Sequence, residues 1–385
     1  MSGLCQQSVD SVYCENLDRL FGMVLRDESH PVNSDLGSLR SVRSGRLRSA
    51  AADTNRYLFS FLPTDLDLFS KLFGDFSAKD HDWENDCVTW ERDGMLLSKW
   101  MRDDSLIAIK DFEVRDDDVW VVTYPKSGTT WMQAIMSLVA VGGDEEKIKT
   151  TYMQNVPFIE MPMVPHYSLL DRMPSPEKLL DQAPSPRMIK THLQDIHLPR
   201  QLLEKTKPKI IYVARNPKDV AVSFFHFHTY NRSLPKYTDW NLFYEDYKKD
   251  NVIYGSWFQH NLFWWKRRHH SNVLFLKYED MKIDPKGAII QVADFMGYKL
   301  SDDAINKIVD KSSFKTMKSS EKVGPPADKS GLFDPKYYKD PSFFIRKGVT
   351  GDWKNHFTVA QNEEFDEICK GKLDGTGLYD DDYSY

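Results

Sequence analysis

The chain has 385 residues, of which 41% are hydrophobic and 13% aromatic, which is enough to form one large core. Its formal net charge is -6 at pH 7. This balance argues against a nucleic-acid-binding protein, and it restricts any anion site to a local basic cluster.

Cysteine spacing and hydropathy predict where the protein works. The cysteines (Cys5, Cys14, Cys87 and Cys369) have neither disulfide-scaffold nor metal-ligand spacing. The first residues lack the basic and apolar regions of a signal peptide, and no apolar run approaches the roughly 18 residues of a membrane helix. These patterns predict a cytoplasmic protein with no membrane span.

Residues 1–56 show little hydrophobic periodicity and contain the serine- and arginine-rich stretch SDLGSLRSVRSGRLRSAAAD. Such a composition predicts a disordered extension. The alternative is a basic regulatory or membrane-surface patch made by Arg40, Arg43, Arg46 and Arg48. Residues 57–385 are predicted to form a single domain that begins with an aromatic lead-in.

Beyond Asp118, β-rich runs alternate with helical patterns. The predicted strands are VWVVTY from 119, RMIKTH from 187, KIIYVAR from 209 and NVLFLKYED from 272, and the helical patterns include Asp219–Phe227 and Val252–Arg268. This alternation predicts an α/β fold with a central parallel sheet flanked by helices on both faces. Ligands of such sheets bind at the carboxyl ends of the strands.

The first predicted strand runs into TYPKSGTTW and then into a helical pattern, a context in which backbone N–H groups gather around an anion. The kinase pattern GxxxxGK[ST] is absent, because Lys126 precedes Gly128. A nucleotide kinase would also need an acidic magnesium ligand at a strand end. The aspartates at 116–118 precede the strand and are predicted to be its solvated start, so no metal site is expected.

Arg215 and Ser223 lie on either side of a predicted helix start. Arg215 ends a strand, and Ser223 lies one or two turns into the next helix, so both could contact one phosphate. The alternative is an ordinary helix entry in which Asn216 is the N-cap, Pro217 is the first helical residue and Arg215 forms a salt bridge.

Lys190 and His192 fall on the same side of a strand at its carboxyl end. A histidine beside a lysine, with no carboxylate in sequence reach, tends to stay neutral, which is the state that a general base needs. An ordinary packed histidine is the alternative.

The stretch FFIRKGVTGDW offers a third cationic loop, at Arg346, Lys347 and Gly348, in which backbone N–H groups could help to hold an anion. Ordinary solvated charges are the alternative. Three cationic loops, at Lys126, Arg215 and Arg346, beside a potential base predict a ligand with more than one anionic group.

Several motifs of the chain resemble those of one family. They are TYPKSGTTW, PSPRMIKTHL, VARNPKDVAVSFFHF, YGSWFQH, YEDMK, SFKTMK and RKGVTGDWKNHFTVAQNEEFD, in this order. Together, over about 118–366, they resemble the cytosolic sulfotransferase family. The resemblance implies a P-loop-like nucleotide-binding sulfotransferase fold for the predicted domain. It also implies transfer of the sulfuryl group of 3′-phosphoadenosine-5′-phosphosulfate (PAPS) without a metal, which leaves the nucleotide PAP.

The resemblance also implies roles for single residues. The phosphosulfate would be held by Lys126, Ser127, Gly128, Thr129 and Thr130, the 3′-phosphate by Arg215, Ser223, Arg346, Lys347 and Gly348, and the adenine by Trp131, Tyr278, Ser312 and Phe314. Relatives commonly have threonine at Ser312, so a hydroxyl is kept. His192 would be the general base and Lys126 would stabilise the leaving phosphate, while Lys190 would steady the transferring sulfuryl oxygens.

Phe158 and Phe227 match two aromatic residues that flank the acceptor in this family, and together with Lys190 and His192 they would form the acceptor site. This implies a small apolar acceptor such as a phenol, a sterol or an alcohol, with hydroxyl and amine both open. Two alternatives on the same fold are an alcohol dehydratase, which uses activated sulfate to drive elimination, and a nucleotide-binding protein without activity.

The stretch KNHFTVAQNE resembles the family's short dimer motif, with Lys354, Thr358, Val359 and Glu363 in the spacing KxxxTVxxxE. In a two-fold contact the strip would meet its own copy, which predicts a homodimer. A helix start with Thr358 as N-cap and Glu363 as a solvated charge is the other interpretation, and both can hold.

Overall fold

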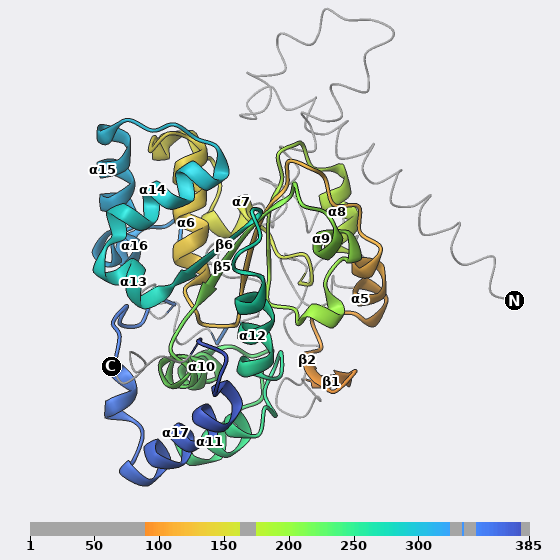
Figure 1. Cartoon of the computed structure of the whole chain (residues 1–385), viewed down its shortest axis with the longest axis vertical. Coiled ribbons are helices and arrows are strands. Elements are labelled where there is room, and N and C mark those ends of the chain that lie inside the picture. The colour runs from red at the N-terminus through yellow and green to blue at the C-terminus, as the bar shows by residue number, and fades with distance from the viewer. Residues whose placement is uncertain (1–88, 162–174, 324–332, 335–343, 379–385) are drawn as a thin grey trace, which may run out of the picture. The chain divides into compact units, whose positions relative to one another are not determined.

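The computed structural model describes residues 89–161, 175–323, 333–334 and 344–378, all within one compact unit, Lys79–Tyr385 (Figure 1). The predicted disordered extension, its arginine patch and most of the aromatic lead-in lie outside the described residues. The start of the predicted domain at 57 therefore stays a prediction.

The central sheet has four parallel strands in the order β4-β3-β5-β6. They are β3 (Val119–Thr123), β4 (Met188–Thr191), β5 (Lys209–Ala214) and β6 (Val273–Lys277). Each lies within one of the predicted runs, so all the predicted strands are confirmed. β3 is buried along its whole length, which explains why its sequence is apolar at nearly every position rather than at alternate ones.

Helices cover both faces of this sheet, as the alternation of patterns predicted. Trp120 and Val122 of β3 pack in one core cluster, and Val119 and Val121 pack in the other, because successive side chains of a strand point to opposite faces. One cluster includes α10 (Pro217–Tyr230), α12 (Trp257–Arg267) and α17 (Val359–Leu373). The other includes α6 (Thr129–Ala140), α14 (Pro285–Met296) and α15 (Asp302–Lys311), which group together in Figure 1.

The remaining described elements are short. They are the antiparallel pair β1 (Thr89–Arg92) and β2 (Met95–Ser98), the helices α5 (Asp103–Lys110), α7 (Tyr152–Asn155), α8 (Pro176–Gln182), α9 (Arg200–Glu204), α11 (Trp240–Lys248), α13 (Tyr278–Ile283) and α16 (Phe314–Ser319), and the 3-10 turns Glu145–Lys147, Asp195–His197 and Asp352–Asn355. None of the helices in the described part is both long and apolar enough to cross a membrane.

One predicted helix begins later than expected. The pattern indicated a helix from Val252, but α12 begins at Trp257. Tyr254 and Gly255 have positive φ angles of 69° and 67°, and left-handed residues cannot be part of a right-handed helix. Ser256 then caps α12 by accepting a hydrogen bond from the N–H of Gln259.

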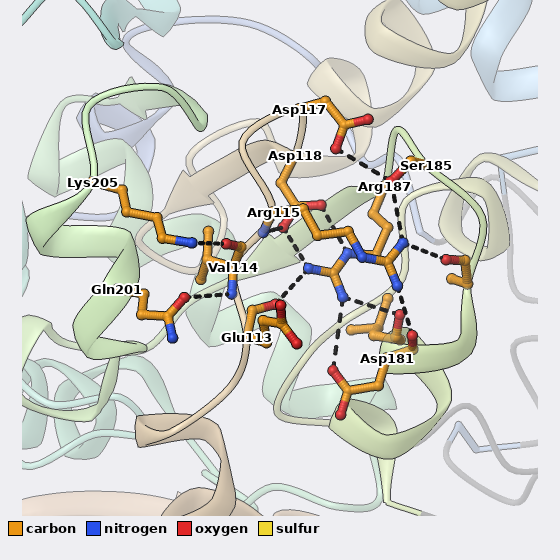
Figure 2. Close-up of polar contacts among 12 residues, drawn as sticks. Glu113, Val114, Arg115, Asp117, Asp118, Asp181, Ser185, Arg187, Gln201 and Lys205 are labelled. Atoms are coloured by element: carbon orange, nitrogen blue, oxygen red, sulfur yellow. Dashed lines mark hydrogen bonds and ion pairs between the residues drawn. The ribbon is translucent and has the colours of Figure 1, made fainter.

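The prediction that residues 116–118 are a solvated strand start is wrong for Asp118, which is fully buried. Figure 2 shows its carboxylate against Arg187, whose Nε and Nη2 donate to it over 2.7 and 2.6 Å. Arg187 also donates to the carbonyls of Glu113 and Leu180. Beneath the start of β3, this network provides the charge pairing that a buried carboxylate requires.

Arg187→Ala should lower the free energy of unfolding by about 3–5 kcal/mol, because it leaves the buried Asp118 carboxylate without its cation. Denaturant unfolding would measure the change. Arg200→Ala is the matched control, since the Arg200–Asp111 pair is exposed and should contribute at most about 1 kcal/mol. Equal losses in both variants would contradict a special role for the buried pair.

Candidate active site

The loop between β3 and α6 has the conformation of an anion-binding turn. Gly128 precedes the first helical residue with φ 107° and ψ 18°, and no side chain in the described part of the protein caps α6. The first N–H groups of the helix therefore remain available to an anion. A Cβ atom on Gly128 would lie 2.8 Å from the Tyr278 ring, so glycine is needed both for its φ angle and for this close approach.

Polar atoms around this loop are buried without partners. Ser127 Oγ, Trp131 Nε1 and Arg215 Nε have no hydrogen-bond partner among the described residues. Thr129 differs, because its Oγ1 lies 2.7 Å from Thr123 Oγ1, and Thr130 follows it half-buried in the first turn of α6. Because unpaired buried polar atoms are costly, those of Ser127, Trp131 and Arg215 fit a site that is completed by a polar ligand.

Lys126 lies in the same turn, with φ 68°. Its Nζ is 4.1 Å from the centroid of the Phe227 ring and 5.7 Å from that of Phe344. Burial, together with the smaller effects of the charges of Arg215 and Arg346, lowers the pKa of Lys126 to about 7. The three cationic loops singled out in the sequence are therefore close enough to interact.

Arg215 follows β5 and joins two loops. Its Nη1 donates to the carbonyl of Lys126 over 3.0 Å, its Nη2 donates to the carbonyl of Val349 over 3.1 Å, and its guanidinium lies over the Tyr278 ring. The alternative of an ordinary helix entry is correct for Asn216, which accepts N-cap hydrogen bonds, and for Pro217 at the first position of α10. Ser223 lies half-buried in the second turn of α10.

Arg346 and Lys347 are held by one carboxylate. Arg346 Nη1 and Lys347 Nζ each lie 2.7 Å from a carboxylate oxygen of Asp352, so both are paired, unlike the solvated charges of the alternative interpretation. Gly348 follows with a positive φ of 63°, and a Cβ atom there would lie 2.2 Å from the Phe314 ring. The glycine therefore lets Phe314 pack directly against the cationic loop.

Two of the four residues expected around adenine contact each other. The rings of Trp131 and Tyr278 meet edge to face with centroids 5.5 Å apart, beside Arg215. Phe314 lies against the loop at Gly348. Ser312 is buried, and its hydroxyl donates to the carbonyl of Ile308 over 2.7 Å, which leaves its oxygen free to accept a bond.

His192 follows β4 and is bound to the end of β3. Its Nδ1 lies 2.7 Å from the carbonyl oxygen of Thr123, the residue at the end of β3 before the anion loop. Since a carbonyl only accepts, Nδ1 carries the proton and Nε2 of the neutral ring carries the lone pair. The pKa of His192 lies well below its ordinary value, chiefly because of burial and secondly because of the charge of Lys190.

Lys190 is buried near this histidine. Its Nζ donates to Gln133 Oε1 over 3.3 Å and lies 3.6 Å from the centroid of the Phe158 ring. Phe158 also packs edge to face on His192, with ring centroids 5.1 Å apart. Burial lowers the pKa of Lys190 to about 7. A neutral imidazole, a lysine side chain and an aromatic ring thus meet at the carboxyl end of β4.

The sequence did not reveal several residues of this site. Glu160, which is 32 positions from His192 in the chain and so outside its sequence reach, accepts a hydrogen bond from the His192 backbone N–H over 2.7 Å. Tyr254 packs on the other side of the His192 ring. Glu160 could have been found by its place in the chain, since it lies only two residues after Phe158, which was already a predicted site residue.

Among the residues that the structure describes, no group of three or more histidine, cysteine, aspartate or glutamate side chains could hold a metal ion. The described residues provide a neutral histidine, two buried lysines, and backbone N–H groups and arginines suited to binding anions.

Comparisons with known proteins agree with this arrangement. The sulfotransferase domain family matches residues 116–377. Sulfotransferase 1C2 of Homo sapiens is 41% identical over 276 residues, which cover 71% of this chain and 89% of that protein. Sulfotransferase 1A1 of Canis lupus familiaris is 40% identical over 286 residues, with 74% and 92% covered.

Solved structures are also similar. Mouse sulfotransferase SULT7A1 complexed with PAP has a TM-score of 0.63 and 32% identity, covering 76% of this chain and 96% of that chain. Retinol dehydratase in complex with androsterone and the inactive cofactor PAP has a TM-score of 0.65 and 26% identity, covering 76% and 92%. With a family match over more than half of its length, the chain belongs to the sulfotransferase family.

Proposed function

We propose that this sulfotransferase moves the sulfuryl group of PAPS to the hydroxyl of a small apolar acceptor and releases PAP. The observation that carries the proposal is the bond between His192 Nδ1 and the Thr123 carbonyl, which ties a neutral base to the anion loop. The PAP that is bound in similar structures supports the choice of donor.

Two sets of residues bind the two anionic groups of PAPS. The α6 N-terminus and Ser127 hold the phosphosulfate, while Arg215 and the loop at Arg346 hold the 3′-phosphate. His192 Nε2 accepts the proton of the acceptor hydroxyl as its oxygen attacks sulfur. Lys126 stabilises the charge that develops on the leaving phosphate, and Lys190 stabilises the transferring oxygens.

Aromatic rings support an apolar acceptor. Phe158 lies against His192, and Phe227 lies under the Lys126 ammonium. Phe227 in turn contacts Phe333, with ring centroids 6.3 Å apart. Such walls favour a phenol, a sterol or an apolar alcohol over a charged acceptor. An amine acceptor is chemically compatible with the same base.

Incubation of the purified protein with labelled PAPS and a panel of phenols, sterols, alcohols and amines tests the proposal. We expect a sulfated product with at least one apolar hydroxyl compound. Mass spectrometry of the product separates sulfation from elimination, because a dehydratase would release an alkene and free sulfate. Binding of PAP without any turnover over the whole panel would contradict the proposal.

We further propose that the enzyme is a homodimer that acts in the cytoplasm, as the resemblance to cytosolic sulfotransferases implies. Thr358 is the N-cap of α17 in a capping box, so the local interpretation of this strip is correct. Val359, by contrast, is 76% exposed. A large exposed apolar side chain between charged residues supports a contact with its own copy.

Val359→Glu should convert a dimer to a monomer, as measured by light scattering at micromolar concentration. The strip is small compared with a standard interface of roughly 1,200 Å² or more, so one buried charge should be enough to separate the copies. Ile107→Glu, at an exposed apolar position of α5, is the matched control and should leave the mass unchanged. If the protein without substitutions is a monomer at micromolar concentration, the proposed dimer is refuted.

A further inference from the structure

Glu160 replaces a main-chain carbonyl at the end of a strand pairing. The segment before Glu160 pairs with β4. The N–H of Lys190 donates to the carbonyl of Pro157 over 2.9 Å, and the N–H of Ile159 donates to the carbonyl of Lys190 over 3.1 Å. In a continued parallel ladder, the N–H of His192 would donate to the carbonyl of Ile159. It donates instead to Glu160 Oε1 over 2.7 Å.

Glu160 also lies beside the main chain of Lys190, because it directly follows Ile159, whose N–H donates to the Lys190 carbonyl. Glu160 is only 1% exposed and Lys190 only 3%. Burial raises the pKa of Glu160 to about 7, while the bond from His192 and the charge of Lys190 act against that rise. Burial likewise lowers the pKa of Lys190, and Glu160 acts against it. In a dry site each group therefore favours the charged form of the other.

We propose that Glu160 is a positioning residue for sulfuryl transfer, which fixes the main chain of His192 and keeps the positive charge on Lys190. The inference rests on the proposed roles of these two residues. The other groups that aim the Lys190 ammonium, the Gln133 amide and the Phe158 ring, are neutral. They can orient the ammonium, but a carboxylate is needed to compensate its burial.

Several other titratable groups face this pair from the neighbouring elements. They are Lys126 of the anion loop, Tyr254 before α12, His192 after β4 and His260 of α12. Tyr254 stays a neutral phenol, because burial raises its pKa well above the ordinary value. Both histidines stay neutral because burial lowers the pKa of each. Burial also lowers the pKa of Lys126 to about 7, so Lys126 must be followed separately from Lys190.

Glu160→Gln isolates the charge, since its amide oxygen can still accept the bond from His192. The rate of a single turnover at saturating PAPS should then fall on the alkaline side at a lower pH. Without the carboxylate, Lys190 loses its proton earlier, and an opposite charge at this range shifts a pKa by about 1–3 units. At a pH below the pKa of Lys190 in both proteins, the rate of the variant should be close to that of the unchanged enzyme. PAP binding should be unaffected.

A second measurement does not require turnover. In protein with ¹³C-labelled lysine, the resonance that is missing from Lys190→Arg identifies Lys190, and the one missing from Lys126→Arg identifies Lys126. We expect Glu160→Gln to lower the titration midpoint of Lys190 more than that of Lys126. Glu160→Ala also removes the acceptor for His192, so its rate should stay low at every pH.

Glu177→Gln is the matched control, because Glu177 is buried and accepts a bond from Ser105 Oγ over 2.7 Å. It should lower stability but leave both the pH profile and the Lys190 midpoint unchanged. If Glu160→Gln reduces the rate equally at every pH with an unmoved midpoint, the inference is wrong. If the unchanged protein transfers no sulfuryl group, the proposed function fails, and the Lys190 midpoint alone decides whether Glu160 holds its charge.

Discussion

His192→Ala should slow the single-turnover transfer of the sulfuryl group by about 10²–10⁴-fold, the usual contribution of a general base. PAP should bind the variant almost as well as the unchanged protein, because Nε2 acts on the acceptor and Nδ1 is bound to Thr123. Rapid-quench assays with labelled PAPS would measure the rate, and calorimetry would measure the affinity for PAP.

His197→Ala provides the control for the removal of a buried imidazole. His197 is fully buried and lies near Asp93. Its replacement should reduce stability while the rate remains near that of the unchanged enzyme. Near-normal turnover by His192→Ala would contradict the role of His192 as the base, and an equal loss in both variants would attribute the effect to packing.

Arg215→Ala should weaken the binding of PAP far more than that of adenosine 5′-phosphate. Only PAP carries a 3′-phosphate, and the loss of a buried, charge-assisted partner costs roughly 2–5 kcal/mol. Arg215 is 8% exposed, and its Nε has no partner among the described residues, as expected for a group that completes its bonds with a ligand. Calorimetry with both nucleotides would measure the difference.

The comparison of the two nucleotides controls for indirect effects. Arg215 also donates to the carbonyls of Lys126 and Val349, so its removal loosens two loops. Such loosening would weaken both nucleotides alike. Equal losses would therefore mean that Arg215 supports the loops and that the 3′-phosphate is bound elsewhere.

The sequence was sufficient to predict the sheet and the strand, turn and helix that form the proposed anion loop, because both depend on local patterns. An apolar run such as that of β3, followed by a turn and a helix start at Thr129, is recognisable within a few residues. The late start of α12 was missed because Tyr254, a residue with a bulky side chain, has a left-handed conformation that no local preference indicates.

The partners of the polar residues depend on tertiary contacts and could not be predicted. The Thr123 carbonyl that fixes the tautomer of His192 is 69 positions away in the chain. Arg187, which pairs with the buried Asp118, is also 69 positions from it in the chain. Without that partner in view, the three aspartates had the pattern of a solvated turn. Residue types indicated which groups could bind anions, whereas the fold decides which charges are compensated.

Asp352 gives the cationic loop a built-in counterion. Both Arg346 and Lys347 bind it, and although burial raises its pKa, the hydrogen bonds from Lys347, Asn355 and Arg346 keep that pKa below the ordinary value. A dissolved anion that approaches this loop therefore meets a field that is already partly screened, which slows electrostatic capture. The pairing with Asp352 also orders the Arg346 and Lys347 side chains before the ligand binds, so binding removes less rotational freedom from them. The affinity for a phosphate at this loop should accordingly depend less on ionic strength than the number of its cations suggests.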